Sequence, residues 1–178
     1  MGWKTRKSET ELETDYVTVI RNEVELKDGT VIPDFYTVKI QDAALAVALT
    51  TDHQVLLKKE YRYACQDDII ECPAGMIEEG EDPFQTIRRE LLEETGYTSD
   101  NWTYIGPAKE STAKLTNTLH IFLAKDCIKV AEQDLDPSEE LELIRVPFEE
   151  SIEMVMDGRI WANGTAHALL KVARMMGK

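Results

Sequence analysis

The chain has few of the residues that support thiol or imidazole chemistry. Its three cysteines and three histidines are scattered along 178 residues, and no CxxC pair is present. An odd number of widely spaced cysteines does not indicate a zinc site or a redox pair, so we interpret Cys65, Cys72 and Cys127 as buried or idle thiols. Scattered histidines give little support to a histidine metal site or a Ser-His-Asp triad. Any chemistry must therefore depend mostly on carboxylates.

Positive charge and long apolar runs are also scarce. Lys and Arg number 20 against 34 Asp and Glu, which gives a formal net charge of -14. This balance argues against a nucleic-acid-binding surface, because such a surface needs clustered cations. A small anionic substrate stays possible if metal ions attract it. No apolar run approaches the roughly 18 residues of a membrane span, and the N-terminus lacks the apolar core of a signal peptide. We expect a cytoplasmic protein with neither nucleic acid nor membrane as a partner.

The order of the predicted elements indicates strands first and helices later. Residues 14–50 are expected to form strands with a turn at 27–30, and two more strands follow at 54–63 and 68–75. Further strands are expected at 102–106, 118–126 and 141–146, and helices at 147–158 and 162–178. The acidic segment 131–140 is expected to be a mobile surface loop. An apolar content of 43% suits one domain with a short extension.

A helix at residues 83–95 is predicted by its ends and by its period. Asp82 can cap its N-terminus, Gln85 has the spacing of a capping box, and Gly96 suits the left-handed residue after its C-terminus. One apolar stripe should pack this helix on a sheet. The stripe consists of Phe84, Ile87 and Leu91.

Three carboxylates, those of Glu90, Glu93 and Glu94, share one face of this helix because they lie within one turn. Their mutual repulsion invites a counter-ion, and removal of one charge is expected to raise the melting temperature in the absence of Mg²⁺. Carboxylates without His or Cys favour Mg²⁺ or Mn²⁺ over zinc. On the helix alone, a solvated acidic face is the other interpretation.

The residues around the helix follow one fixed pattern. It reads Gly75, five residues, Glu81, seven residues, Arg89-Glu90-Leu91, one residue, Glu93-Glu94, one residue, Gly96-Tyr97. This is the Nudix box without a mismatch, so the chain resembles Nudix hydrolases. The resemblance implies an α/β (α+β) fold with a mixed β-sheet sandwiched between α-helices. It also implies metal-dependent cleavage of a diphosphate linkage in a nucleoside diphosphate derivative.

The resemblance assigns a metal site within the box. Glu90 and Glu94 would be the principal ligands of Mg²⁺, with Mn²⁺ as a substitute. Glu93 would join them directly or through water and take part in catalysis. Gly75 allows a sharp turn beside the helix, so the carbonyl group of Ala74 can face the carboxylates as a further ligand. Bound metal ions would lower the pKa of a bound water, so neither a covalent intermediate nor a histidine is needed.

Other carboxylates and one arginine would support this catalysis. Arg89 can hold a carboxylate by a bidentate bond, and Glu81 resembles a brace for the loop. The residue that orients the attacking water should come from the acidic loop, where we choose Glu140, with Glu139 and Glu142 as alternatives. A solvated surface segment is the competing interpretation of this loop.

The run at 60–83, EYRYACQDDIIECPAGMIEEGEDP, is similar to the ADP-ribose pyrophosphatase branch of the family. On that resemblance Arg62 would contact a substrate phosphate, and a surface arginine paired with a carboxylate is the alternative. Glu71 would position a ligand or a water near the metal ions. The Gly75 backbone would also belong to the substrate-binding residues.

Two departures concern the base and sugar of the substrate. The segment 108–120 lacks the proline-glycine loop ending in glutamate that is common in this branch, and residues 34–40 lack the Arg-Glu pair that some members use for adenine. ADP-ribose, cleaved to AMP and ribose 5-phosphate, is the favoured substrate. Another nucleoside diphosphate sugar, such as GDP-mannose or ADP-glucose, is the alternative. A non-catalytic nucleotide sensor is less favoured, because it usually brings a helix-turn-helix or a degraded box.

The resemblance extends to domain organisation. Residues 1–45 are expected to form an N-terminal β-strand extension, and residues 46–178 the Nudix domain. The early strands alternate more apolar residues than a small flap can bury alone, and the similar branch uses such strands to form intertwined dimers. We therefore expect a homodimer.

Overall fold

The computed structural model describes residues 2–136 and 140–177. The chain divides into two compact units. The first comprises Met1–Asp42 and Lys109–Thr118, and the second comprises Ala43–Ala108 and Leu119–Lys178. Residues 109–118 pack with the first unit although they are far from it in the sequence. The local sequence pattern does not predict this contact.

The first unit contains, in its described part, an antiparallel sheet in the order β1-β2-β3. The strands are β1 (Lys4–Glu13), β2 (Thr18–Glu25) and β3 (Val31–Lys39). The turn between β2 and β3 uses Gly29, whose φ of 86° suits a glycine. The sequence does not predict β1, because KTRKSETELE is polar at almost every position and lacks an apolar alternation. Its ladder with β2 and the ion pairs of Arg21 with Glu9 and Glu11 hold it instead.

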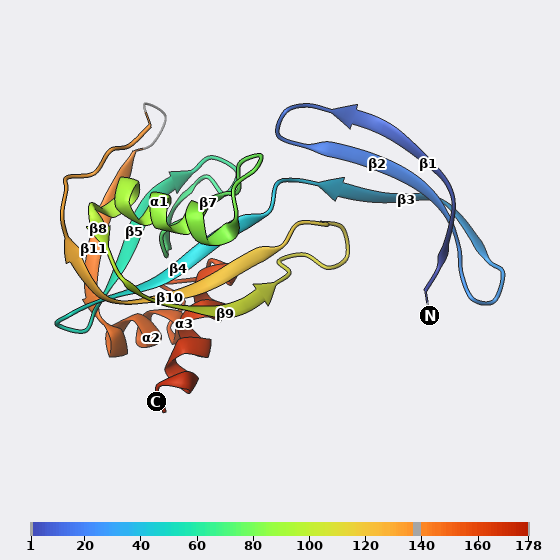
Figure 1. The fold of residues 1–178 in the computed structure, drawn as a ribbon. Coiled ribbons are helices and arrows are strands. Elements are labelled where there is room, and N and C mark those ends of the chain that lie inside the picture. Colours follow the sequence, from blue (N-terminus) through green and yellow to red (C-terminus); the bar gives the residue numbers. More distant parts are fainter. Residues whose placement is uncertain (1, 137–139, 178) are drawn as a thin grey trace. The chain divides into compact units, whose positions relative to one another are not determined.

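The second unit contains, within the described residues, an eight-stranded mixed sheet whose central order is β11-β5-β4-β10-β8 (Figure 1). β6 pairs with β5, β7 with β4, and β9 with β10. β4 and β10 run parallel, and the other pairs are antiparallel. The strands are β4 (Ala43–Thr50), β5 (Gln54–Arg62), β6 (Asp67–Glu71), β7 (Ala74–Met76), β8 (Tyr97–Thr98), β9 (Asn101–Ala108), β10 (Leu119–Lys129) and β11 (Leu141–Pro147).

Helices cover both faces of this mixed sheet, which confirms the predicted fold class (Figure 1). They are α1 (Pro83–Thr95) on one face, and α2 (Phe148–Met156) and α3 (Asn163–Met175) on the other. Among the described residues, no helix is long and apolar enough to cross a membrane.

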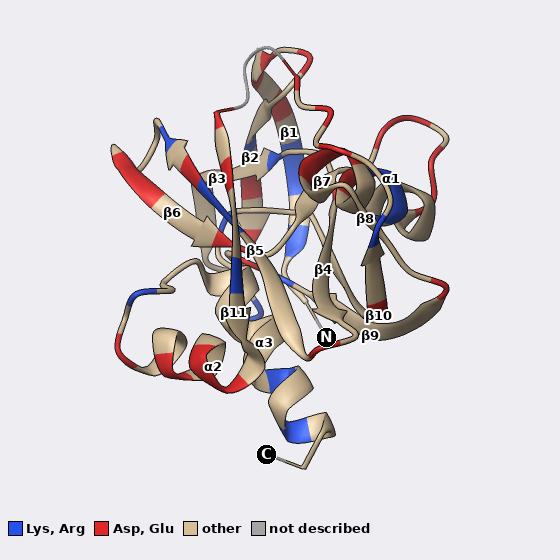
Figure 2. Ribbon diagram, turned by 90° about the vertical axis from the view of Figure 1, so that its left-hand side faces the viewer, with Lys and Arg blue, Asp and Glu red and all other residues tan. Residues whose placement is uncertain are grey.

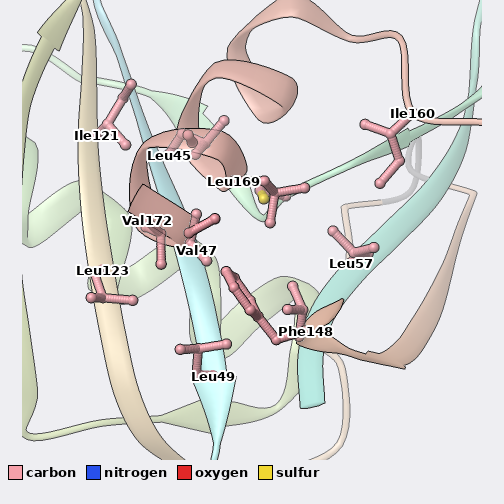
Figure 3. Close-up of a cluster of buried hydrophobic side chains, with 14 of the residues drawn as sticks. Leu45, Val47, Leu49, Leu57, Ile121, Leu123, Phe148, Ile160, Leu169 and Val172 are labelled. Carbon is pink, nitrogen blue, oxygen red and sulfur yellow. The ribbon is translucent and has the colours of Figure 1, made fainter. Parts of the chain in front are cut away.

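The strand β4 separates two parts of the core, because successive side chains of a strand point to opposite faces. Its large side chains, Leu45, Val47 and Leu49, pack with α2 and α3 (Figure 3). Its small side chains, Ala44, Ala46 and Ala48, lie in the clusters that contain Ile87 and Leu91 of α1. The alanine face therefore allows α1 to approach the sheet closely.

The helix α1 begins and ends where the sequence predicts. The side chain of Asp82 accepts hydrogen bonds from the backbone N–H groups of Phe84 at 2.8 Å and Gln85 at 3.1 Å, and Gln85 completes the capping box. Gly96 follows with a left-handed φ of 74°. The stripe residues Ile87 and Leu91 are fully buried, while Phe84 stays partly exposed. This packing fixes the rotation of α1 about its axis and so decides where its glutamates point.

Candidate active site

The three box glutamates of α1 differ in burial. The side chain of Glu94 is 2% exposed, that of Glu90 is 14% exposed, and that of Glu93 is 39% exposed. Acidic and basic residues lie together on α1 and on the nearby strands (Figure 2). The helix thus presents a graded set of carboxylates, from the protein interior to the surface.

The backbone at β7 lies directly against two of these carboxylates. The N–H group of Ala74 donates a hydrogen bond to Oε2 of Glu94 at 3.1 Å. A Cβ atom on Gly75 would lie 2.1 Å from the carboxyl carbon of Glu90, so only glycine leaves room for that side chain. The pairing of β7 with β4, on which α1 also packs, brings the loop and the helix together. Ala74, Gly75, Glu90 and Glu94 therefore converge, although they are far apart in the chain.

Arg89 connects the exposed side of this site. Its guanidinium group donates to both carboxylate oxygens of Glu81 at 3.2 Å and to Glu93 at 3.0 Å, and it forms an ion pair with Glu90 at 2.8 Å. Glu81 also accepts hydrogen bonds from the Thr86 hydroxyl group and from a loop N–H group, which suits the brace predicted for it. Hydrogen bonding to Glu81 raises the pKa of Arg89 above its usual range, so Arg89 remains a cation.

Lys58 is a part of the site that the sequence reasoning missed. Its side chain is 3% exposed, and its ammonium group donates a hydrogen bond to Oε1 of Glu94. The same ammonium group lies 3.5 Å from the carbonyl oxygen of Ala74 and 3.6 Å from Oε2 of Glu60. The available signal was alternation along β5, since Leu56 contacts the α1 side of the core and Lys58 is two residues later.

Burial shifts the ionisation of the two inner carboxylates. It raises the pKa of Glu94 to about 7, and the nearby Lys58 cation is the main opposing influence. It also raises the pKa of Glu90, against the opposing effect of Arg89. Positive charge beside these groups therefore favours their ionised forms, and a bound cation would do the same.

The oxygen donors of the site suit a hard cation. The carbonyl group of Ala74 and the carboxylates of Glu90 and Glu94 are ligand types that Mg²⁺ and Mn²⁺ prefer. In the described part of the chain, no three Asp, Glu, His or Cys side chains form a ready-made metal site. The acidic groups are instead paired with Lys58 and Arg89. The position of the Lys58 ammonium group beside both Ala74 and Glu94 shows that these donors attract a cation.

Arg62 and Glu71 bind one another. The guanidinium group of Arg62 donates to Oε2 of Glu71 at 2.9 and 2.7 Å, and to Glu60 at 3.1 Å. Arg62 is thus paired with carboxylates, as the alternative interpretation states. Arg62 shares the α1 face of β5 with Lys58, because the two residues are separated by an even number of positions.

The segment after β10 folds back onto the C-terminal end of α1. The side-chain amide group of Gln133 donates to the carbonyl group of Glu94 at 2.7 Å, and the N–H group of Asp134 donates to the carbonyl group of Glu93 at 2.9 Å. The acidic loop therefore begins at the C-terminal end of α1, against the backbone of Glu93 and Glu94. Residues 137–139, which include the alternative candidate Glu139, lie outside the described residues.

The other two loop candidates are not equivalent. Glu140 is exposed, and no contact within the described residues joins it to the carboxylates of α1. Glu142 is opposite Lys59 in the β5–β11 ladder, while Leu143 packs on the α1 side of the sheet. Alternation along β11 therefore directs Glu142 away from α1.

Comparison with known proteins identifies the family. A family model described as the NUDIX domain matches residues 39–163, which is more than half of the chain. The chain therefore belongs to the Nudix family of hydrolases, as the box residues predict.

Individual relatives refine this likeness. The ADP-ribose pyrophosphatase of Bacillus subtilis is 33% identical over 133 residues, which are 74% of this chain and 72% of that protein. A GDP-mannose pyrophosphatase of Cronobacter sakazakii is 30% identical over 155 residues, which are 80% of this chain and 81% of that protein. A crystal structure of an ADP compounds hydrolase matches with a TM-score of 0.85 at 19% identity, over 99% of this chain and 95% of that chain. The predicted resemblance to the ADP-ribose pyrophosphatase branch is confirmed.

Proposed function

We propose that this chain uses Mg²⁺ to hydrolyse the diphosphate linkage of a nucleoside diphosphate sugar, and that ADP-ribose is cleaved to AMP and ribose 5-phosphate. The observation that carries the proposal is the convergence of Ala74, Glu90 and Glu94 at one site within a complete Nudix box. The identity to the Bacillus subtilis ADP-ribose pyrophosphatase supports the choice of ADP-ribose.

The proposed metal ligands are the carbonyl group of Ala74 and the carboxylates of Glu90 and Glu94, with Glu93 joining directly or through water. When bound, Mg²⁺ would neutralise charge on the diphosphate and make water a better nucleophile. Arg89 contributes by holding Glu90 and Glu93 in place, which keeps two flexible carboxylates in a fixed arrangement. Mn²⁺ has similar ligand preferences and is the expected substitute.

Arg62 is the proposed contact for a substrate phosphate. Its guanidinium group is partly exposed and lies on the face of β5 that faces α1, which carries the proposed metal ligands. Hydrogen bonds to Glu71 and Glu60 fix its position. A phosphate that replaces Glu71 as its partner would leave the Glu71 carboxylate available to position a water or a ligand. The backbone of Gly75 is also proposed to contact substrate through its main-chain groups, because the space beside its Cα is filled by Glu90.

Glu140 is the proposed group that orients the attacking water. The contacts of Gln133 and Asp134 with the backbone carbonyl groups of Glu94 and Glu93 support this choice, because they hold the start of the acidic loop against the helix that carries the box carboxylates. A loop carboxylate approaching from this side could act on water while the helix carboxylates hold the metal ion.

Hydrolysis of GDP-mannose or ADP-glucose is the second candidate activity. The identity to a GDP-mannose pyrophosphatase favours it. The metal ligands would be unchanged, and only the contacts with the base and the sugar would differ. The absence of the adenine-recognising pair from residues 34–40 is consistent with GDP-mannose, which has no adenine.

We also propose that the chain forms a homodimer through residues 1–45. Among the described residues of the first unit, Val24 is the single buried apolar side chain. A sheet this small needs an apolar face packed against another element. Exposed apolar residues on its strands include Leu12, Val31 and Tyr36. A second copy of these strands would supply the missing core.

The direct test of the activity is a substrate comparison. The full-length protein would be assayed on ADP-ribose, ADP-glucose, GDP-mannose, NADH and 8-oxo-dGTP, each with Mg²⁺ and with EDTA. We expect metal-dependent turnover with the highest kcat/KM for ADP-ribose. A highest value for GDP-mannose or ADP-glucose would select the second candidate, and turnover of 8-oxo-dGTP alone would reject both.

A further inference from the structure

The ammonium group of Lys58 lies inside the carboxylate cluster. It donates to Glu94, lies 3.5 Å from the carbonyl oxygen of Ala74, and lies 3.6 Å from a carboxylate oxygen of Glu60. Ala74 and Glu94 are two of the groups that the proposed function assigns to a metal ion. The contacts of Lys58 thus coincide with part of the proposed ligand set.

The fold keeps Lys58 in this position. Leu56, on the same face of β5, packs with Leu91 of α1. Leu143 of β11 lies directly opposite Lys58 in the ladder and belongs to the same apolar cluster. With apolar neighbours along the strand and 3% exposure, the ammonium group has little access to water. Its carboxylate partners must therefore stabilise its charge.

We propose that Lys58 is a built-in cation of the carboxylate cluster, which competes with a divalent metal ion for Ala74 and Glu94 and so weakens metal binding by the free enzyme. The inference rests on the proposed function, because it concerns the same ligands. A positive charge beside the ligands repels a second cation and uses part of the negative charge that would bind it. Lys58 is a positioning residue in this account, since it acts through Glu94.

The test compares two lysines that are adjacent in the chain. Lys58→Met removes the buried cation and keeps a side chain of similar length. Lys59→Met is the matched control, because it removes the same charge from the same strand, where Lys59 forms a surface ion pair with Asp68 at 2.8 Å. Isothermal titration with Mn²⁺ and no nucleotide gives the Kd for each full-length protein. If Lys58 served only to stabilise the fold, its loss would not make metal binding tighter.

Lys58→Met is expected to lower the Kd for Mn²⁺ by about thirtyfold, the effect of removing one positive charge at about 4 Å from a divalent ion in a water-like dielectric. Lys59→Met is expected to match the unaltered chain. An unchanged or higher Kd for Lys58→Met would overturn the proposal. If the Lys58 proposal fails in this way but the unaltered chain shows Mg²⁺-dependent turnover of ADP-ribose, the proposed function still holds. Tighter Mn²⁺ binding without any such turnover would support the role of Lys58 and reject the activity.

A second measurement covers the case in which Lys58→Met does not fold. Among the described lysines, Lys58 alone is buried, so its ammonium protons should exchange slowly with water. Nuclear magnetic resonance of the unaltered chain, labelled with ¹⁵N at lysine Nζ, should then show a persistent signal from this group. Addition of Mg²⁺ is expected to shift or broaden that signal. A signal that stays fixed at Mg²⁺ concentrations that support turnover would overturn the proposal.

Discussion

Glu90 lies directly over Gly75, so closely that a Cβ atom on Gly75 would be 2.1 Å from the Glu90 carboxyl carbon. Gly75 is not among the residues with a positive φ, so its backbone conformation is open to other residues. The glycine of the box is required here by the neighbouring carboxylate. A substitution at Gly75 therefore tests whether Glu90 must occupy this position, because it introduces no unfavourable backbone conformation.

Gly75→Ala is expected to lower turnover by about 10²-fold, the usual effect of a displacement near 1 Å in an active site. The Glu90 side chain can rotate away from the new methyl group, so the melting temperature without metal should change little. Steady-state kinetics and thermal denaturation in EDTA measure the two effects. Near-normal turnover would show that Glu90 need not occupy its position over the loop.

The structure separates Glu90 from Glu94 in their effects on stability. Burial raises the pKa of Glu90 above its usual value of 4.5, so the ionised carboxylate costs stability when no metal is bound. Glu90→Gln is therefore expected to raise the melting temperature in EDTA at neutral pH. This gain should disappear as the pH falls below 4.5, where the wild-type carboxylate is protonated in both the folded and the unfolded state.

Burial also raises the pKa of Glu94, to about 7, but Glu94→Gln is expected to have the opposite effect above that pH, where the ionised carboxylate pairs with Lys58. It would leave the buried Lys58 ammonium group without its main partner, and the loss of one member of a buried pair costs about 3 kcal/mol or more. The ion pair with Lys58 therefore leads us to expect stabilisation on removal of the charge of Glu90 but not of Glu94. Thermal denaturation of both variants in EDTA provides the measurement, with the exposed Glu132→Gln as a control. Stabilisation by Glu94→Gln would contradict the buried pair.

The acidic loop offers a matched comparison between two glutamates. Glu140→Gln is expected to lower kcat by about 10²-fold or more with little change in KM, as for a positioned base. Glu142→Gln should retain kcat, because Glu142 faces away from α1 beside Lys59. Kinetics of both variants, with Glu139→Gln alongside, test the choice. Normal kcat for Glu140→Gln would assign the water-orienting role to another group.

The oligomeric state tests the proposed use of the N-terminal strands. One chain has a mass of 20.3 kDa. Light scattering at micromolar concentration is expected to give twice this mass, because Val24 is the single buried apolar residue described in the first unit. A mass equal to that of one chain would contradict the proposed dimer.

Local patterns predicted much of the site. The caps of α1, its apolar stripe and the spacing of its glutamates all act within a few residues, so the sequence displays them directly. The contacts made by Arg89 follow from the same helix and the loop just before it. Such features can be predicted because each depends on neighbours in the chain.

Long-range pairings were harder to predict. Lys58 and Glu94 are 36 positions apart. Alternation along β5 puts Lys58 on the same face as Leu56, but the local sequence does not show that this face packs against α1. β1 was missed because its polar residues give no alternation, and its position depends on pairing with β2. Glu142 can likewise be assigned to the face of β11 that points away from α1 only when the pairing of β11 with β5 is known.

The central claim is metal-dependent cleavage of a diphosphate linkage by the carboxylates of α1. Its most direct test is ³¹P nuclear magnetic resonance of ADP-ribose incubated with the unaltered chain and with Glu90→Gln, each with Mg²⁺ and with EDTA. We expect the diphosphate signals to give way to the two monophosphate signals of AMP and ribose 5-phosphate only for the unaltered chain with Mg²⁺. Equal conversion by Glu90→Gln, or conversion that persists in EDTA, would contradict it.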